Sequence, residues 1–172
     1  VAPPWNFPYA IPMGGIAAAL VSGNSVIFKP APESVLVAWE LVNQLWEAGV
    51  PKSVLHFLPS EDNEVGKYLV THKDVDGVVL TGSYETALLF KKWKPTLRLL
   101  AETSGKNSIV VTASADIDTA VKDIIDSAFG HAGQKCSAAS LAIVEGSIYD
   151  NPAFFKQLKD AVGSLKAGDP SD

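Results

Sequence analysis

Short β-branched runs alternate with amphipathic segments along the whole chain, and this alternation limits the available folds more than any other feature. The predicted strands are residues 25–28, 54–58, 77–80, 97–101, 108–111 and 141–144. The predicted helices are residues 34–48, 63–71, 84–93, 116–128 and 152–165. Strands separated by helices pair in parallel, because the chain crosses back over each helix before it re-enters the sheet. The sequence therefore predicts an α/β fold with a largely parallel sheet.

A domain boundary is predicted just after Glu102, where the strand at 97–101 gives way to Thr103-Ser104-Gly105. Residues 1–102 would form one domain and residues 103–172 the beginning of a second. The sequence starts without Met and stops within a polar stretch. We therefore expect it to be an internal fragment of a longer protein.

Composition excludes several classes of protein. Fourteen Lys and Arg against nineteen Asp and Glu give a net charge of −5, so the chain lacks the broad basic surface that nucleic acids and anionic membranes require. The longest apolar stretch, around Ile16–Val21, is far shorter than the roughly 20 residues of a membrane span. The single cysteine, Cys136, excludes an internal disulfide and multi-cysteine metal sites, and the three histidines are far apart. We expect no nucleic-acid partner, no membrane span, no metal and a cytoplasmic location.

Cys136 lies among small and polar residues, in Gly133-Gln134-Lys135-Cys136-Ser137, rather than in an apolar run. A lone cysteine is commonly a small buried side chain. These neighbours instead favour a loop, and the ammonium group of Lys135 would favour the nucleophilic thiolate. A buried structural thiol and a nucleophile both stay open on the local sequence.

Glu102 and Lys29 lie where predicted strands end. Open α/β sheets bind ligands at the carboxyl edge of the strands, so Glu102 is a candidate general base and Lys29 a candidate contact for a ribose or phosphate. Ordinary solvated charges at strand ends are the alternative for both.

Gly82 and Ser83 lead directly from a strand into the helix at 84–93. Free N–H groups at a helix N-terminus suit a pyrophosphate, although Ser83 could equally be only a helix cap. Asn6 is restricted by Pro4 and Pro8. Its amide is a candidate donor to a developing oxyanion, and a turn-forming asparagine is the alternative.

Five motifs, in this order and spacing, resemble the aldehyde dehydrogenase superfamily over the whole chain. They are Pro4-Trp5-Asn6-Phe7-Pro8, Lys29-Pro30, Thr81-Gly82-Ser83, Glu102-Thr103-Ser104-Gly105-Lys106 and Gly133-Gln134-Lys135-Cys136. The resemblance implies a Rossmann-like NAD(P)-binding domain over residues 1–102, followed by the truncated start of an α/β catalytic domain. It also implies an oxidoreductase with a covalent cysteine intermediate.

The resemblance also implies a role for each candidate residue. Cys136 would attack the aldehyde to give a thiohemiacetal, whose oxyanion is held by Asn6 and by the N–H of Cys136. Hydride transfer to the nicotinamide would leave a thioester, which Glu102 hydrolyses by activating water. Lys29 would contact the adenosine ribose of the cofactor, while Gly82 and Ser83 would contact its pyrophosphate.

The closer resemblance is to the branch that oxidises L-glutamate γ-semialdehyde to L-glutamate in proline catabolism, the Δ1-pyrroline-5-carboxylate dehydrogenases. It rests on residues 130–138, Gly-His-Ala-Gly-Gln-Lys-Cys-Ser-Ala. In that branch Ser137 would bind the α-carboxylate of the substrate. Another carboxylated aldehyde, such as succinate semialdehyde, and a non-catalytic product of the same scaffold are the alternatives.

NAD is the default cofactor and NADP stays open, because Pro32 stands where this family usually has an acidic residue, and Glu33 only follows it. The intact protein is expected to be a homo-oligomer. Whether it stands alone or is fused to a proline dehydrogenase stays open. The isolated chain is expected to show little or no turnover.

Overall fold

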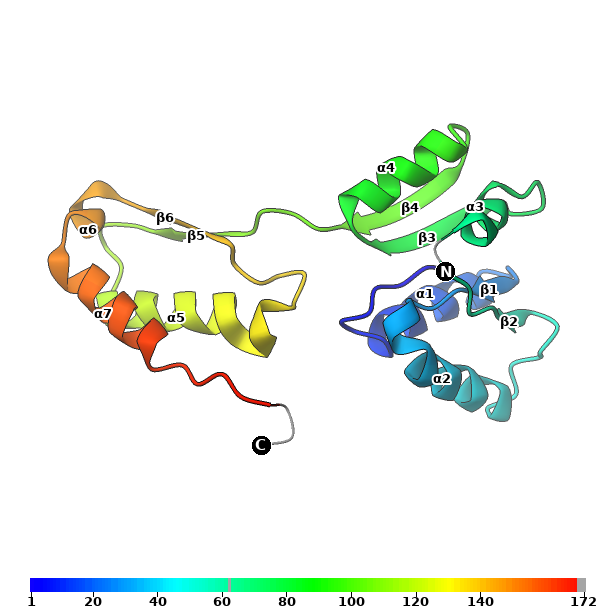
Figure 1. Ribbon diagram of the computed structural model, residues 1–172, viewed down its shortest axis with the longest axis horizontal. Coiled ribbons are helices and arrows are strands. Elements are labelled where there is room, and N and C mark those ends of the chain that lie inside the picture. Colours follow the sequence, from blue (N-terminus) through cyan, green and yellow to red (C-terminus); the bar gives the residue numbers. More distant parts are fainter. Residues whose placement is uncertain (62, 170–172) are drawn as a thin grey trace. The chain divides into compact units, whose positions relative to one another are not determined.

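The computed structural model describes residues 1–61 and 63–169, and the last three residues of the predicted second domain, 170–172, lie outside them. The chain divides into two compact units, Val1–Ser104 and Gly105–Asp172 (Figure 1). This division falls two residues after the predicted boundary. Each unit has its own parallel strands and its own buried core.

The first unit contains two pairs of parallel strands. β1 (Val26–Phe28) pairs with β2 (Leu55–Phe57), and β3 (Gly77–Gly82) pairs with β4 (Arg98–Thr103). Each pair is separated in sequence by a helix, which is the connection that parallel strands require. The predicted α/β class with parallel strands is confirmed.

Residues 1 and 2 join these two pairs into one sheet. The carbonyl of Val1 accepts a hydrogen bond from the N–H of Lys29, immediately after β1, at 3.0 Å. Ala2 donates to the carbonyl of Val79 at 2.8 Å and accepts from the N–H of Thr81 at 3.0 Å, both in β3. The order across the sheet is therefore β2, β1, residues 1–2, β3, β4. When residues 1–2 are counted as the first strand, the strands lie across the sheet in the order third, second, first, fourth, fifth, which is the Rossmann arrangement. The strand order reverses between residues 1–2 and β3.

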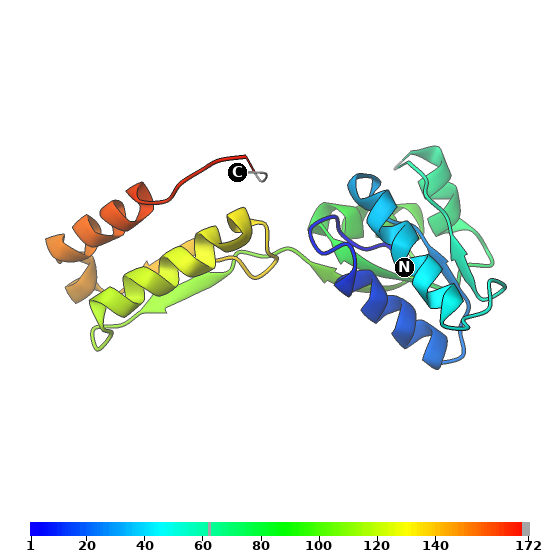
Figure 2. The same cartoon turned by 90° about the horizontal axis from the view of Figure 1, so that it is seen from below.

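Two helices cover each face of this sheet (Figure 2). α1 (Ala10–Val21) and α2 (Val35–Glu47) pack on one face, and α3 (Glu64–Thr71) and α4 (Tyr84–Trp93) pack on the other. The two faces bury separate apolar clusters, which are Ile16, Val26, Phe28, Ala38, Leu41, Val42 and Leu55 on the first, and Val70, Val78, Leu80, Ala87 and Leu97 on the second.

The sequence pattern does not predict α1. Apolar residues occur all round this helix, so no 3.6-residue period stands out, and Pro12, Gly14 and Gly15 lower its intrinsic propensity. Close packing on the sheet outweighs that propensity. A Cβ added at Gly15 would lie only 3.1 Å from a methyl group of Val1.

We expect Leu41→Ala, in the core under α2, to lower the free energy of unfolding by about 2–5 kcal/mol, because it removes packed methyl groups and leaves a cavity. Leu41 is 1% exposed, whereas Leu36 on the same helix is 81% exposed. Leu36→Ala is therefore the matched control and should change stability by no more than about 0.5 kcal/mol. Urea titrations followed by circular dichroism measure both, and equal losses would contradict the assigned core.

The second unit pairs β5 (Ser108–Val111) with β6 (Leu141–Val144) in parallel. α5 (Ile117–Phe129), α6 (Gly146–Tyr149) and α7 (Pro152–Gly163) complete it, and Figure 2 shows α5 lying along the strand pair. Its core consists of Val111, Val121, Ile124, Ile148 and Phe154.

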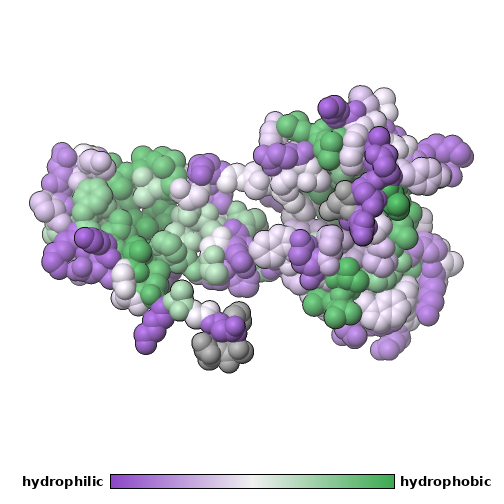
Figure 3. Space-filling view, viewed as in Figure 1, coloured by the Kyte–Doolittle hydropathy of each residue, from purple (hydrophilic) through white to green (hydrophobic). Residues whose placement is uncertain are grey.

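The other face of the β5–β6 pair is apolar and exposed. Val110, Leu141 and Ile143 are each about half exposed or more. Figure 3 shows that hydrophobic side chains gather on the visible face of this unit. Cross-strand pairing of Val110 with Ile143 makes this face continuous. Within residues 1–61 and 63–169, no helix is both long and apolar enough to cross a bilayer.

Asp116 caps the N-terminus of α5. Its carboxylate accepts a hydrogen bond from the N–H of Thr119 at 2.8 Å, and this bond lowers the pKa of Asp116 below its ordinary value of 3.8. A group whose pKa falls on folding stabilises the fold above its unfolded pKa, and this contribution is lost as the pH falls through the folded pKa.

We therefore expect Asp116→Asn, which keeps an acceptor but cannot titrate, to lower the melting temperature at pH 7 and to lose this deficit as the pH falls below about 4. Thermal melts of both proteins between pH 7 and pH 3 measure the effect. Parallel curves throughout that range would show that the charge of Asp116 does not stabilise α5.

Candidate active site

Four of the predicted site residues lie at one edge of the first sheet. Parallel strands share their carboxyl edge, and Lys29, Ser83 and Glu102 lie at the carboxyl ends of β1, β3 and β4. Asn6 follows residues 1–2, which form the central strand of the sheet. This edge is where open α/β sheets bind ligands, and the reversal of strand order lies between residues 1–2 and β3.

Ser83 and Gly82 connect β3 to α4. The hydroxyl of Ser83 accepts a hydrogen bond from the N–H of Thr86 at 3.0 Å, so this side chain caps the helix. A Cβ added at Gly82 would meet only a methyl of Leu80, at the ordinary contact distance of 3.6 Å. The space next to Gly82 is therefore open.

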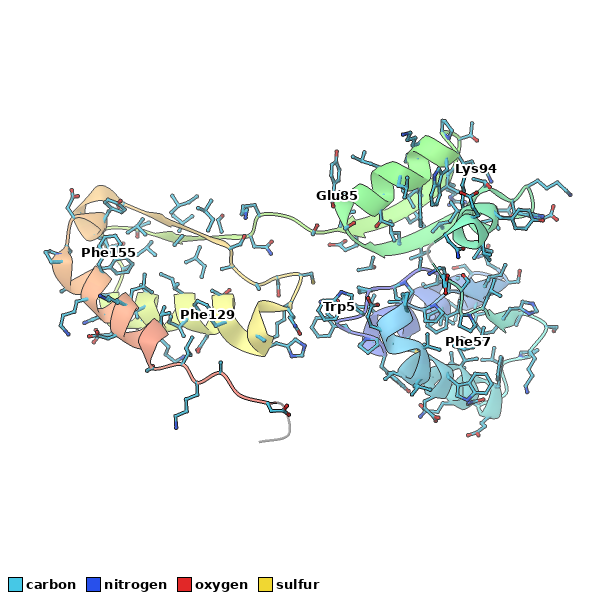
Figure 4. All side chains as sticks on the ribbon, in the orientation of Figure 1. Trp5, Phe57, Glu85, Lys94, Phe129 and Phe155 are labelled. Atoms are coloured by element: carbon cyan, nitrogen blue, oxygen red, sulfur yellow. The ribbon has the colours of Figure 1, made fainter. Side chains whose placement is uncertain are left out.

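Lys29 and Asn6 are both half-buried. The ammonium of Lys29 is 3.5 Å from the carbonyl of Pro30, and its side chain runs towards Gly66 in α3. Lys29 thus extends from the carboxyl end of β1 to the first turn of α3, the helix that follows β2 in sequence. Asn6 lies in the loop between the central strand and α1, near Trp5, which is labelled in Figure 4.

Glu102 lies inside β4, opposite Thr81 of β3, and its side chain is exposed. The strand runs on to Thr103, so Glu102 is held by strand pairing on the main chain and not by a loop. Strand pairing fixes the main chain that carries this carboxylate, and the exposed side chain can reach a water molecule. Both properties suit a general base.

Cys136 lies in the second unit, beyond the left-handed segment that ends α5. α5 stops at Phe129, labelled in Figure 4, and His131, Ala132 and Gly133 then have φ angles of 54°, 55° and 70°. A left-handed backbone costs about 1–2 kcal/mol at a residue with a side chain. At Gly133 a Cβ would also lie only 3.0 Å from the carbonyl of Ala128, so glycine is required there.

The thiol itself lies on a tight turn and is exposed. The N–H of Ala138 donates to the carbonyl of Lys135 at 3.0 Å, so Cys136 and Ser137 are the two central residues of the turn. Among the residues that the structure describes, none accepts a hydrogen bond from the N–H of Cys136. Within this chain the thiol of Cys136 is therefore not part of a buried core, and its N–H is not used in holding the turn.

Asn107, just before β5, holds this turn from outside. Its amide nitrogen is 2.6 Å from the carbonyl oxygen of Cys136 and 3.1 Å from that of Ala138. The main-chain carbonyl of Asn107 accepts a hydrogen bond from the N–H of Ser140 at 3.0 Å. No sequence motif identifies Asn107, because a contact between a side chain and a distant main chain leaves no local pattern.

Ser137 and Lys135 line a shallow pocket of the second unit with Ile109, Asp123, Asp126 and Ser127. Asp126 pairs with Lys122 at 3.1 Å, and the carboxylate of Asp126 raises the pKa of that lysine. The pocket is therefore lined by the two residues that flank Cys136 in sequence and by two aspartates, one of which is paired with a lysine. In the described part of the chain, no three His, Cys, Asp or Glu side chains are grouped to hold a metal ion.

The structure thus gathers Asn6, Lys29, Ser83 and Glu102 at one sheet edge of the first unit, and Cys136 with Ser137 on one turn of the second. The aldehyde dehydrogenase family model matches residues 1–172, the full extent of the chain. The chain belongs to the aldehyde dehydrogenase family. The resemblance seen in its five motifs is confirmed.

Two curated relatives of this aldehyde dehydrogenase chain have the same name. The chain is 41% identical over 180 residues to a 1-pyrroline-5-carboxylate dehydrogenase of Oceanobacillus iheyensis, covering 100% of this chain and 35% of that protein. It is 46% identical over 156 residues to a protein of the same name from Staphylococcus aureus, covering 86% of this chain and 30% of that one. The chain therefore spans about a third of the length of these relatives.

Solved structures of the family match in the same way. Proline utilization A (PutA) from Corynebacterium freiburgense superposes with a TM-score of 0.89 at 50% identity, covering 96% of this chain and 17% of that one. A 1-pyrroline-5-carboxylate dehydrogenase from Thermus thermophilus gives a TM-score of 0.90 at 37% identity, covering 97% and 34%. The aldehyde dehydrogenase fold is therefore shown for the part of it that this chain comprises.

Proposed function

We propose that this chain is part of an NAD(P)-dependent dehydrogenase that oxidises L-glutamate γ-semialdehyde to L-glutamate in proline catabolism. The observation that carries the proposal is the exposed thiol of Cys136 on a hydrogen-bonded turn whose N–H at Cys136 is available. The shared name of the curated relatives, 1-pyrroline-5-carboxylate dehydrogenase, supports the choice of substrate.

The first step is addition of the Cys136 thiolate to the aldehyde carbon. A carbon–sulfur bond forms, and the electron pair of the C=O bond moves onto oxygen. The N–H of Cys136 and the side-chain amide of Asn6 would donate to this oxyanion, and two fixed donors stabilise such charge strongly. The product is a thiohemiacetal anion on the enzyme.

Collapse of that oxyanion expels hydride and leaves a thioester on Cys136. The nicotinamide cofactor, when bound, accepts the hydride. Glu102 then takes a proton from water, the resulting hydroxide attacks the thioester carbonyl, and the thiolate of Cys136 leaves. The carboxylic acid product is released, the thiolate of Cys136 is regenerated, and Glu102 returns its proton to solvent.

The carboxyl edge of the first sheet fits such a dinucleotide. The reversal of strand order, the open space at Gly82 and the N-terminus of α4 are together the features that a pyrophosphate needs. Lys29 would contact the adenosine ribose, and Gly82 and Ser83 the pyrophosphate. We propose NAD as the cofactor, and initial rates with NAD and NADP in turn test this choice.

Ser137 would bind the α-carboxylate of the substrate from the pocket beside the thiol. We expect Ser137→Ala to raise KM for L-glutamate γ-semialdehyde about 10-fold, as loss of a hydrogen bond to a charged group implies. KM for an aliphatic aldehyde without a carboxylate should change little. Ser147→Ala, at an exposed position of α6 in the same unit, is the matched control, and equal effects of Ser137→Ala on both aldehydes would exclude this role.

The full-length protein is proposed to be a homo-oligomer, either separate or fused to a proline dehydrogenase. One structural neighbour is described as a bifunctional proline utilization A protein, which supports the fused arrangement. A nucleophilic thiol requires a reducing compartment, so we also propose a cytoplasmic location.

A further inference from the structure

The carbonyls that flank Ser137 are both bound by one side chain. The amide group of Asn107 donates one N–H to the carbonyl of Cys136 at 2.6 Å and the other to that of Ala138 at 3.1 Å. An asparagine amide has two donors, and this arrangement uses both of them. Asn107 is half-buried, and its own main chain is held by Ser140 at the start of the run into β6.

These bonds determine how Cys136 is oriented. The peptide before Cys136 is held through the carbonyl of Lys135, which accepts from the N–H of Ala138 at 3.0 Å. The peptide after Cys136 is held by Asn107. Fixing the planes on both sides of a Cα fixes φ and ψ there. The directions of the Cα–Cβ bond of Cys136 and of its N–H are thereby set.

We infer that Asn107 is a positioning residue for the reaction at Cys136. This inference rests on the proposed function. Asn107 holds the turn so that the thiol of Cys136 faces the carbonyl carbon of the substrate and the N–H of Cys136 faces the oxygen of the same carbonyl. The turn has one hydrogen bond of its own, from the N–H of Ala138 to the carbonyl of Lys135, and Asn107 adds two bonds from outside the turn.

The most informative variant is Asn107→Asp, made in the full-length enzyme that contains this chain. Aspartate has the shape of asparagine but at neutral pH it donates no hydrogen bond and repels the two carbonyls. We expect kcat to fall about 10- to 100-fold, because displacements of a reacting group by about 1 Å cost about that much. KM for NAD should stay within about twofold, since Asn107 is not among the residues proposed to contact the cofactor. Asn107→Gln, which keeps both donors, should retain more activity than Asn107→Ala. If Asn107→Asp does not fold, the comparison of these two variants tests the inference instead.

Asn151→Ala is the matched control for lost stability. Asn151 caps α7 in the same unit, through a bond from the N–H of Ala153 at 3.0 Å, and it is not among the contacts of the Cys136 turn. This control should lower the melting temperature while leaving kcat within about twofold. Asn107 variants that keep kcat within twofold of wild type, or an Asn151→Ala variant that loses as much kcat, would overturn the inference.

The rate of Cys136 alkylation by iodoacetamide separates this inference from the proposed function, because it needs neither aldehyde nor cofactor. We expect Asn107→Asp to change that rate at least about threefold and to shift its pH profile, whereas Asn151→Ala should leave both unchanged. A wild-type enzyme that makes no NADH from the aldehyde, but shows this pattern, would refute the proposed function and support the role of Asn107. Unchanged alkylation in an Asn107→Asp enzyme would refute that role.

Discussion

Replacement of Cys136 by alanine should reduce NADH formation by the full-length enzyme by a factor on the order of 10⁴ or more, as is found when a catalytic nucleophile is removed. The side chain is exposed, so its loss removes little packing and the melting temperature should stay close to that of wild type. Initial rates, melting curves and NAD binding by fluorescence measure the three quantities on the same preparation.

This combination is what distinguishes a chemical role for Cys136 from a structural one. Loss of NADH formation with unchanged folding and NAD binding identifies the thiol as the nucleophile. Substantial residual turnover in Cys136→Ala would instead mean that another group attacks the aldehyde, and the covalent mechanism would have to be abandoned.

Replacement of Glu102 by glutamine should separate the two halves of the reaction. Hydride transfer precedes the hydrolytic step, so the first turnover should still release NADH as a burst. Steady-state turnover should fall about 10²- to 10⁴-fold, because glutamine cannot take a proton from water. Mass spectrometry of the peptide that contains Cys136 should then find the acyl group as a trapped thioester.

Glu40→Gln is the control for this experiment. Glu40 is an exposed glutamate on α2, within the same unit as Glu102, and its replacement should leave both the burst and the steady state unchanged. Loss of the burst in Glu102→Gln would place Glu102 before hydride transfer and contradict its role as the hydrolytic base.

The alternation of strands and helices is sufficient to predict most elements of this fold. All six named strands and five of the seven α-helices coincide with predicted segments to within a few residues, because their apolar periods and caps are local. The central strand is not predicted, since residues 1–2 are too short to show a period and are defined by hydrogen bonds to the neighbouring strands, such as those with Lys29, Val79 and Thr81. The helix α1 is not predicted because packing, not periodicity, stabilises it.

The candidate site divides in the same way. Cys136 and Glu102 can be proposed from residue type and motif, and the capping role of Ser83 follows from its place before a helix. Asn107 and the left-handed residues at 131 and 132 cannot, because their roles depend on contacts with the main chain about 30 residues away or on backbone angles. Sequence motifs identify the groups that react, whereas the structure identifies what holds one of them in place.

The most direct test of the central claim is the formation of NADH from L-glutamate γ-semialdehyde by the full-length protein, compared with succinate semialdehyde and an unsubstituted aliphatic aldehyde. We predict that kcat/KM for L-glutamate γ-semialdehyde exceeds both others by at least about 10-fold, since only this substrate offers its α-carboxylate to Ser137. A higher kcat/KM for either of the other aldehydes would contradict the proposed substrate, and absence of NADH with all three would contradict the proposed activity.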